Sequence, residues 1–270
     1  MTSEKEPIMF GRRVFGFGLI ALAIVCLAFG TFDPGQPVPR DFPDRPALAY
    51  AAAIFMLCAG MAVEWRRTAA WGAAAIAVYF AFVVVLMNGP VVLAHMTEYG
   101  SYSGPAAQLA IAAGGLIIFA ETAGIDAALA ARLRRAGQMT FGICAVLFGG
   151  AHFFYMNLTA PLVPKWLPPD QEFWGYATGI AHIAAGLAIL TGTLARIAAI
   201  LLTVMYASFT PLVHVPSLLA DPSSHWYWSE NAANLLLTAV AWVVADSFAR
   251  ATIRASEFQP AASAAQLPPS

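Results

Sequence analysis

Three histidines lie in or beside apolar segments in the second half of the chain. His152 stands near the start of "GAHFFYMNLTAPLVPKWLP", His182 lies in "GIAHIAAGLA", and His214 lies in "LVHVP". An imidazole can bind a metal or haem iron, and it exchanges protons near neutral pH. Together with a tyrosine it can equally hold a quinone head group. The alternative is that each histidine only forms a hydrogen bond between helices.

The residues around these histidines predict a polar pocket that opens toward one membrane surface. Its candidate cofactor-binding residues are His152, His182, His214, Tyr176, Trp174, Glu230 and Asn234. Several of them also have a structural interpretation, because tryptophans form interfacial belts and amides join helices in lipid. No HxxxH or HExxH spacing is present, so no metal site is predicted. The cofactor stays undefined, with a quinone as one chemical type that fits.

The composition predicts that these histidines lie inside a membrane. The chain has 270 residues, of which 60% are hydrophobic and 11% charged, whereas soluble domains carry about 25% charged residues. The net charge of −1 gives no reason to expect a nucleic-acid partner. Eight apolar stretches are long enough to cross a bilayer, which predicts an all-α polytopic membrane protein in contact with lipid. They cover residues 13–32, 46–65, 68–87, 104–123, 138–158, 171–191, 194–214 and 230–250.

Lysines and arginines gather on one side of these predicted spans. Eleven lie on the side of both termini, and three, Arg40, Arg45 and Lys165, lie on the other. Because cytoplasmic loops carry the excess of such residues, both termini are expected in the cytoplasm, with the chain multi-pass in a bacterial inner membrane. The first span is expected to remain in the protein, since no A-x-A cleavage site follows it. The proline-rich stretch 160–169 is then an outer loop that can cover the pocket, with Trp166 as an interfacial anchor.

The chain partly matches itself at an offset of 126 residues. "FG" at 15–16 falls on "FG" at 141–142, "YAAAIFMLCAGMA" at 50–62 falls on "YATGIAHIAAGLA" at 176–188, and "AAQL" at 106–109 matches "AANL" at 232–235. A four-helix unit crosses the membrane an even number of times, so two copies have the same orientation. The sequence predicts two tandem four-helix bundles: a cytoplasmic tail 1–12, an N-terminal repeat 13–124, a cytoplasmic linker 125–137, a C-terminal repeat 138–250 and a disordered cytoplasmic tail 251–270.

A stripe of small residues marks one helix face in each repeat. The stripe comprises Gly175, Gly179, His182 and Gly186 in the sixth span, and Ala49, Ala53, Met56 and Gly60 in the second. Small residues at this spacing let helices approach closely in lipid. The packing face is thus shared by the repeats, but the histidines are not. Met56 stands at the position of His182, and Cys26 stands at the position of His152.

The cysteines do not suggest redox chemistry of their own. Cys26, Cys58 and Cys144 all lie in apolar runs, and none belongs to a CxxC pair. A free cysteine in such a run behaves as a small hydrophobic residue. We therefore expect structural thiols.

The second half of the chain resembles the DoxX-like family of bacterial membrane proteins. The stretches that carry the resemblance are "GAHFFYMNLTAPLVPKWLP", "FWGYATGIAHIAAGLAILTG", "ARIAAILLTVMY" and "LVHVP", which cover about 138–248. The first half looks like a degenerate copy of the same unit. The resemblance implies a four-helix membrane unit associated with oxidoreductases, some of whose relatives are linked to quinone-coupled sulfur oxidation or to redox-stress assemblies. It assigns no catalytic residue, although His152, Trp166, Pro168 and His214 match pattern positions.

Two classes of function follow from these observations. The first is a redox-associated membrane component that binds a quinone-like cofactor and acts with a partner subunit of a redox assembly. The second is a non-enzymatic membrane scaffold, assembly factor or small-solute carrier in which the histidines serve packing. Thiol–disulfide catalysis is disfavoured, because the paired cysteines of distantly similar disulfide-handling membrane proteins are missing.

Overall fold

The fold is all-helical, and it contains the eight predicted spans. The computed structural model describes the backbone of residues 10–264 and the side chains of residues 10–250. Eight helical segments within this range are long and apolar enough to cross a membrane. They are Phe10–Phe29, Arg45–Glu64, Ala69–Ala94, Tyr99–Thr122, Ala127–Phe154, Gln171–Thr191, Ala195–Ala220 and His225–Arg250. The prediction of an eight-span membrane protein is confirmed.

Five of the spans are single helices or begin a longer one. They are α1 (Phe10–Phe29), α2 (Arg45–Glu64), α7 (Ala127–Phe154), α9 (Gln171–Thr191) and α12 (His225–Ala264). The fourth span is split into α5 (Tyr99–Ser103) and α6 (Ala106–Thr122), because Pro105 between them has no N–H for a helical hydrogen bond. A short α8 (Met156–Thr159) and a 3-10 turn η2 (Ala160–Leu162) lead into the proline-rich loop.

The third and seventh spans each contain a π-helical turn. The third runs through α3 (Ala69–Val83), η1 (Val84–Asn88) and α4 (Gly89–Ala94), and the seventh through α10 (Ala195–Phe209), η3 (Thr210–His214) and α11 (Val215–Ala220). Pro90 and Pro216 lie in the first turn after each π-helix. Proline cannot donate the regular i to i−4 bond, and the wider turn accommodates its ring.

Two predicted boundaries differ from the structure. The linker predicted at 125–137 is mostly helix, because α7 begins at Ala127, where the carboxylate of Asp126 accepts hydrogen bonds from the Ala128 and Leu129 N–H groups, both at 3.0 Å. The tail predicted to be disordered at 251–270 continues α12 as far as Ala264. Alanine, arginine and glutamate in this stretch favour extension of a helix that is already formed. Residues 1–9 and 265–270, the ends of the two predicted tails, lie outside the described residues.

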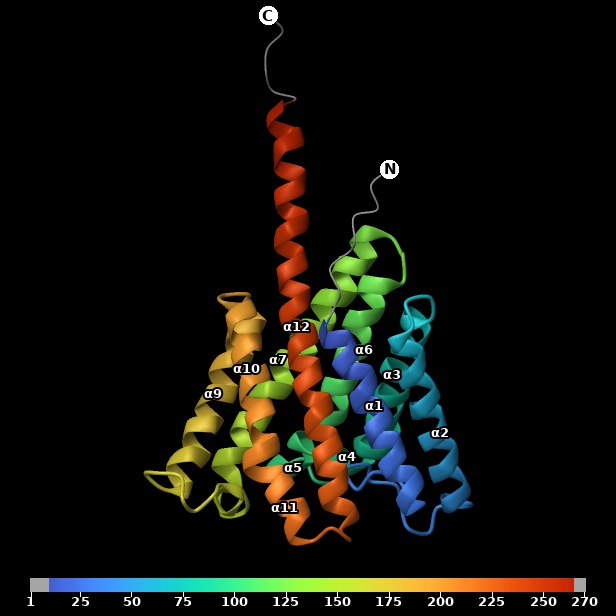
Figure 1. Ribbon diagram of the computed structural model, residues 1–270, viewed down its shortest axis with the longest axis vertical. Helices are drawn as coiled ribbons and strands as arrows, with labels where there is room; N and C mark the ends of the chain where they lie inside the picture. Colours follow the sequence, from blue (N-terminus) through green and yellow to red (C-terminus); the bar gives the residue numbers. More distant parts are fainter. Residues whose placement is uncertain (1–9, 265–270) are drawn as a thin grey trace, which may run out of the picture.

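The eight spans form a closed ring in which the two halves pack against each other at both of their ends. Within the halves, α1, α2, α3 and α6 pack in sequence, and so do α7, α9, α10 and α12. The first helix of each half also packs against the last helix of the other half, α1 on α12 and α6 on α7, while α6 and α12 meet at the centre. Figure 1 shows α12 between α1 and α10, with α2 and α9 at the two far sides. The two four-helix units therefore share a reciprocal interface.

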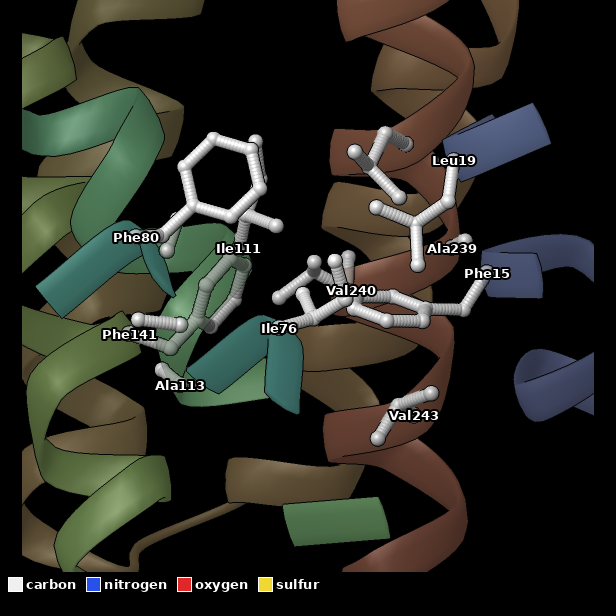
Figure 2. Close-up of a cluster of buried hydrophobic side chains, with 14 of the residues drawn as sticks. Phe15, Leu19, Ile76, Phe80, Ile111, Ala113, Phe141, Ala239, Val240 and Val243 are labelled. Atoms are coloured by element: carbon white, nitrogen blue, oxygen red, sulfur yellow. The ribbon is translucent and has the colours of Figure 1, made fainter. Parts of the chain in front are cut away.

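The hydrophobic core lies at this interface. Figure 2 shows Phe15 of α1 beside Val240 of α12, with the side chains of Ile76, Ile111 and Phe141 on α3, α6 and α7 nearby. Gly114 of α6 leaves room for this packing, because a Cβ there would lie 2.9 Å from both the Phe15 ring and a Val240 methyl group. All of these side chains are buried.

The predicted small-residue faces bring helix pairs together in both halves. A Cβ on Gly60 would lie 3.1 Å from the carbonyl oxygen of Gly16, and one on Gly186 would lie 2.7 Å from that of Gly142. The four residues predicted for the face of α2 are buried, and so are the four predicted for the face of α9. Such approach of backbones replaces the hydrophobic driving force that lipid does not provide.

The offset of 126 residues seen in the sequence recurs in the element bounds. It relates α3 to α10, η1 to η3 and α4 to α11 residue for residue, and it relates the first residue of α5, Tyr99, to the first residue of α12, His225. The π-helical turns, which are rare in proteins, thus occur at matching places. Positions in the two halves can therefore be compared directly.

Candidate functional site

A pair of histidines lies between the closely packed helices α7 and α9. The rings of His152 and His182 have centroids 5.2 Å apart. His182 is 2% exposed and His152 is partly buried. A Cβ at Gly179 would lie 2.9 Å from the Cβ of His152, so the glycine face of α9 makes room for this pair. The end of the ring that holds them is opposite the arginine-rich end, and we call it the outer end.

Hydrogen bonds fix the orientation of both imidazole rings. Nδ1 of His152 lies 3.0 Å from the carbonyl oxygen of Gly175 and 3.1 Å from Oγ1 of Thr178. Nδ1 of His182 lies 2.8 Å from the carbonyl oxygen of Thr178. A carbonyl oxygen only accepts, so Nδ1 of each ring carries the proton. The Nε2 atom of each neutral ring is then a hydrogen-bond acceptor.

Tyr206 of α10 completes the cluster, and it was not among the residues predicted from the sequence. Its ring centroid lies 5.4 Å from that of His182. The residue is 3% exposed, and its hydroxyl has no hydrogen-bond partner among the described residues. A signal was present, because Tyr206 lies three residues after Thr203 and four before Thr210, on the polar face of its helix. A buried hydroxyl without a partner is unusual and marks a place where a ligand or water can bind.

An apolar pocket of about 330 Å³ adjoins this cluster between α9 and α10. Thr178, which contacts His152, lines it, and so does Phe209, whose ring lies 6.5 Å from that of His182. The remaining lining is mostly apolar: Val163, Pro164, Leu167, Trp174, Ala177, Ala181, Met205, Ser208, Leu212 and Val213. The pocket is therefore an apolar chamber with a few polar side chains in its lining, Thr178 and Trp174 of α9 and Ser208 of α10, as small-molecule sites commonly are.

The proline-rich loop covers this pocket at the outer end. Val163, Pro164 and Leu167 contribute to the pocket lining. The indole N–H of Trp174 donates to the carbonyl oxygen of Pro168 at 2.8 Å, and the amide of Gln171 donates to that of Val163 at 2.5 Å. The loop is thus tied to the first turns of α9. The sequence predicted a loop over a histidine pocket; the loop here lines a pocket between α9 and α10, and His152, His182 and His214 do not belong to its lining.

The other predicted site residues do not all join the histidine pair. Trp174 lines the pocket, but Tyr176 is 42% exposed and its ring lies 5.6 Å from that of Phe153. The two residues are separated by two positions on one helix, which points their side chains in different directions. Glu230 lies beside the first half of the chain, where its carboxylate interacts with that of Asp33. This electrostatic interaction between halves could not be read from either repeat alone.

His214 and Asn234 form a second polar group around η3. The two side chains lie next to each other. The Asn234 amide also donates to Oγ1 of Thr210 and to the carbonyl oxygen of Tyr206, both at 2.9 Å. The backbone of Tyr206 therefore links this group to the histidine pair. The amide of Asn231 donates to the carbonyl oxygen of His214 at 2.9 Å, which further holds the π-helical turn.

The matching positions of the first half carry a different chemistry. Asn88 and Gln108, the counterparts of His214 and Asn234, are joined by a 2.9 Å hydrogen bond from the Asn88 amide. Cys26 and Met56 replace the histidine pair, and both are buried in the hydrophobic core. Both halves thus carry a pair of polar side chains at these positions, Asn88 and Gln108 in the first and His214 and Asn234 in the second, whereas the histidine cluster belongs to the second half alone.

The described residues contain no group of three or more His, Cys, Asp or Glu side chains that could hold a metal ion. The two histidines of the cluster have carbonyl, hydroxyl and aromatic neighbours instead. The chemistry available there is hydrogen bonding to a ligand through two Nε2 acceptors and one phenol hydroxyl.

Comparison with known proteins places the second half in a defined sequence unit. A family model described as a domain of unknown function (DUF8561) matches residues 141–245, from α7 to α12. No curated protein and no solved structure matches the chain. The matched segment contains the histidine pair, Tyr206 and the covering loop.

Proposed function

We propose that the second half binds a small ring-shaped apolar ligand, of the quinone or quinol type, in the pocket between α9 and α10. The observation that carries this proposal is the cluster of His152, His182 and the unpaired hydroxyl of Tyr206 beside an apolar pocket. Thr178 and Phe209, which contact this cluster, line the pocket and separate the two. The chamber suits an apolar ring, and the cluster suits its oxygen substituents. The protein would be a redox-associated component of the membrane in this role.

The residues fit the hydroxyl and carbonyl oxygens of such a ligand. The Nε2 acceptors of the two histidines are matched to hydroxyl groups, and the phenol O–H of Tyr206 can donate to a carbonyl oxygen. A bound quinone or quinol supplies electron transfer coupled to protons, which the histidines would accept or return. The partial resemblance to DoxX-like proteins agrees with this role, although the matched family model has no assigned function.

The test is one absorption spectrum and one extraction of the detergent-purified protein. We expect an organic extract with an ultraviolet band that changes on reduction with dithionite. The double substitution His152→Ala and His182→Ala is expected to lower the ligand content at least fivefold.

The matched control exchanges the counterparts in the first half, Cys26→Ala and Met56→Ala, which remove side chains at the repeat-related positions. This variant should keep its ligand. Equal ligand content in both double variants would contradict the proposal, and so would a wild-type spectrum that shows only the absorption of tryptophan and tyrosine. The latter result would favour the second class of function, a scaffold, assembly factor or carrier.

We further propose a bacterial inner membrane as the location, with the arginine-rich end in the cytoplasm, and 13–124 and 138–250 as the two repeats. The excess of basic residues at that end supports the orientation. Reporter enzymes fused after Ser270 test the orientation. A reporter that is active only in the cytoplasm should be active there, and one that is active only outside the cytoplasm should be inactive. The partner subunit of a redox assembly remains part of the proposal, and copurification from native membranes tests it.

A further inference from the structure

The two reciprocal seams of the ring differ in how well they are filled. At the seam between α1 and α12, an open groove of about 630 Å³ runs along the outer half of the molecule. It is lined by Ala21, Ile24, Val25, Ala28 and Phe29 of α1, by Trp228, Asn231, Ala232 and Leu235 of α12, and by Thr210 of η3. Ile24 is 54% exposed, so the groove opens onto the surface that faces hydrocarbon.

A tyrosine fills the matching position at the other seam. The ring of Tyr99 stacks on that of Phe154 with centroids 4.3 Å apart and an interplanar angle of 9°. Its hydroxyl donates to the carbonyl oxygen of Leu147 at 2.8 Å, and a Cβ on Gly150 would collide with that hydroxyl. Leu147, Gly150 and Phe154 are the counterparts of Ala21, Ile24 and Ala28, which line the open groove.

Three exchanges account for the opening. His225 stands at the position of Tyr99, and its ring stacks on Phe29 at 4.5 Å and does not line the groove. Ala28 stands at the position of Phe154, which removes a second ring. Ile24 stands at the position of Gly150 and fills only part of the volume of the two missing rings. Its side chain takes the place that the Tyr99 hydroxyl has beside Gly150 at the other seam. The groove is therefore a seam from which two aromatic rings have been removed.

The polar side chains of the groove are already engaged within the protein. The indole N–H of Trp228 donates to the carbonyl oxygen of Pro222 at 2.9 Å. The amide of Asn231 donates to the carbonyl oxygens of His214 and Tyr227, and Thr210 accepts from Asn234. The side-chain N–H groups of Trp228 and Asn231 are thus engaged within the protein, and the rest of the lining apart from Thr210 is apolar, which suits an apolar occupant. Trp228, near the outer end, is a residue type that prefers the level of lipid head groups.

We infer that one acyl chain of a phospholipid occupies the groove between α1 and α12 as an integral part of the seam. The chain takes the volume that Tyr99 and Phe154 fill on the other side, and its head group lies near Trp228 and His225. Burial of an apolar chain between two packed helices gains dispersion contacts that the loosely ordered bilayer does not give. This site is separate from the histidine pocket and does not depend on its function.

The test is lipid retention of the full chain in native mass spectrometry during stepwise removal of lipid by detergent. The principal variant carries Ile24→Gly, Ala28→Phe and His225→Tyr, which transfers the filled seam to the open one. We expect the wild-type protein to retain one phospholipid and the variant to lose it, with at least a tenfold lower retained fraction. Val78→Phe, at an exposed position of α3 outside the groove, is the control and should retain the lipid.

A second measurement keeps the inference testable if the triple variant does not fold. A phospholipid with a photoreactive group in its acyl chain should label 21–29 and 228–235 in the wild-type protein, and the single substitution Ala28→Trp should reduce this labelling at least fivefold. Equal retention or equal labelling in wild type and groove variants overturns the inference. Retention of an isoprenoid quinone instead of a phospholipid overturns it as well. The dithionite-sensitive band assigned to the histidine pocket should be unchanged in the groove variants, so the two proposals fail separately.

Discussion

At the scale of single residues, the histidine cluster owes its chemistry to its backbone neighbours. Carbonyl oxygens of Gly175 and Thr178 hold the two Nδ1 protons, which leaves both Nε2 atoms as acceptors. Gly175 itself is available because the glycine face of α9 brings its backbone close to α7. The hydroxyl of Tyr206 is the remaining buried polar group without a protein partner in this cluster. A residue of this kind costs stability unless something binds to it.

Tyr206→Phe separates the two roles that this hydroxyl could have. Removal of a buried unpaired hydroxyl should leave the free energy of unfolding unchanged or raise it by about 1 kcal/mol. Ligand retention should fall about tenfold, as expected for one lost hydrogen bond. Thermal unfolding and ligand content, measured on the same preparation, check both effects. A clear loss of stability together with full ligand retention would show that the hydroxyl serves packing alone.

Asp33, in the loop after α1, predicts a pH dependence of stability. Burial raises the pKa of its carboxyl group from 3.8 to about 6, against smaller opposite effects of the Ser229 side chain and the Gly35 main chain. The folded state therefore holds the proton more tightly than the unfolded state does. The contribution to stability is fully present below about pH 4 and is lost as the pH rises through 6.

Asp33→Asn should remove this dependence. The variant should match the wild-type protein near pH 4 and exceed it at pH 7.5 by about 1–3 kcal/mol. Thermal unfolding at a series of pH values measures the difference. Glu230, the neighbouring carboxylate of α12, serves as the second site to test by Glu230→Gln, because it interacts with Asp33. Parallel pH profiles for wild type and D33N would contradict the assignment.

At the scale of helices, the glycine pairs decide how closely the spans approach. A Cβ on Gly186 would also lie 2.8 Å from a methyl group of Val146, in addition to its contact with the Gly142 carbonyl. The same arrangement holds Gly16 against Gly60 in the first half. Close packing of this kind brings His152 and His182 together, so stability and site geometry depend on the same face.

Gly186→Leu should separate α7 from α9. We expect a loss of about 2–4 kcal/mol, because the added side chain overpacks a rigid backbone contact. Ala184→Leu, an exposed position on the same helix, is the matched control and should change stability by less than about 0.5 kcal/mol. Thermal unfolding in detergent measures both. Similar effects of the two substitutions would show that the glycine face does not limit the approach.

The sequence predicted the spans well because a long apolar run has few alternatives in a membrane protein. It did not predict the π-helical turns at 84–88 and 210–214, because a proline near the end of a span marks a break without defining its type. It also placed the start of the fifth span too late. The arginines of 132–135 are charged, yet they lie on a helix whose Arg135 donates to the Ile189 and Leu190 carbonyl oxygens at the end of α9.

The candidate site could be predicted only in part, for a geometric reason. His152 and His182 lie on neighbouring spans with matching small-residue faces, and their proximity follows from that pattern. The place of Tyr206 beside His182 depends on the side-chain arrangement of α10. The interaction of Glu230 with Asp33 depends on how the two halves pack together. Neither follows from periodicity within one helix.

At the scale of the whole molecule, the ring is held by contacts that cross between the halves. Each half contributes its first helix to the last helix of the other. The buried carboxylate of Glu121 on α6 likewise pairs with Arg134 of α7 at 3.0 Å. Neither half completes its own core, since Phe15, Ile111 and Val240 belong to one continuous cluster.

Separation of the chain between Gly124 and Ile125 tests this dependence. The two fragments should copurify when they are produced together, because the reciprocal seams remain intact. Each fragment alone should aggregate or be degraded, since its share of the core is exposed. Copurification through a tag on one fragment, followed by size-exclusion chromatography, gives the readout. Stable monodisperse fragments in separate expression would contradict an interdependent core.

The reciprocal seams also describe what a dimer of one identical four-helix chain would look like. In such a dimer every side chain occurs twice, so a histidine pocket on one side brings a second pocket on the other, and a sealed seam brings a second sealed seam. Joining two copies in one polypeptide removes this constraint. Here the histidine pair is present once, Tyr99 closes one seam, and the other stays open. A ring built from two similar halves thereby becomes asymmetric, and the histidine pocket and the open seam can change independently of each other.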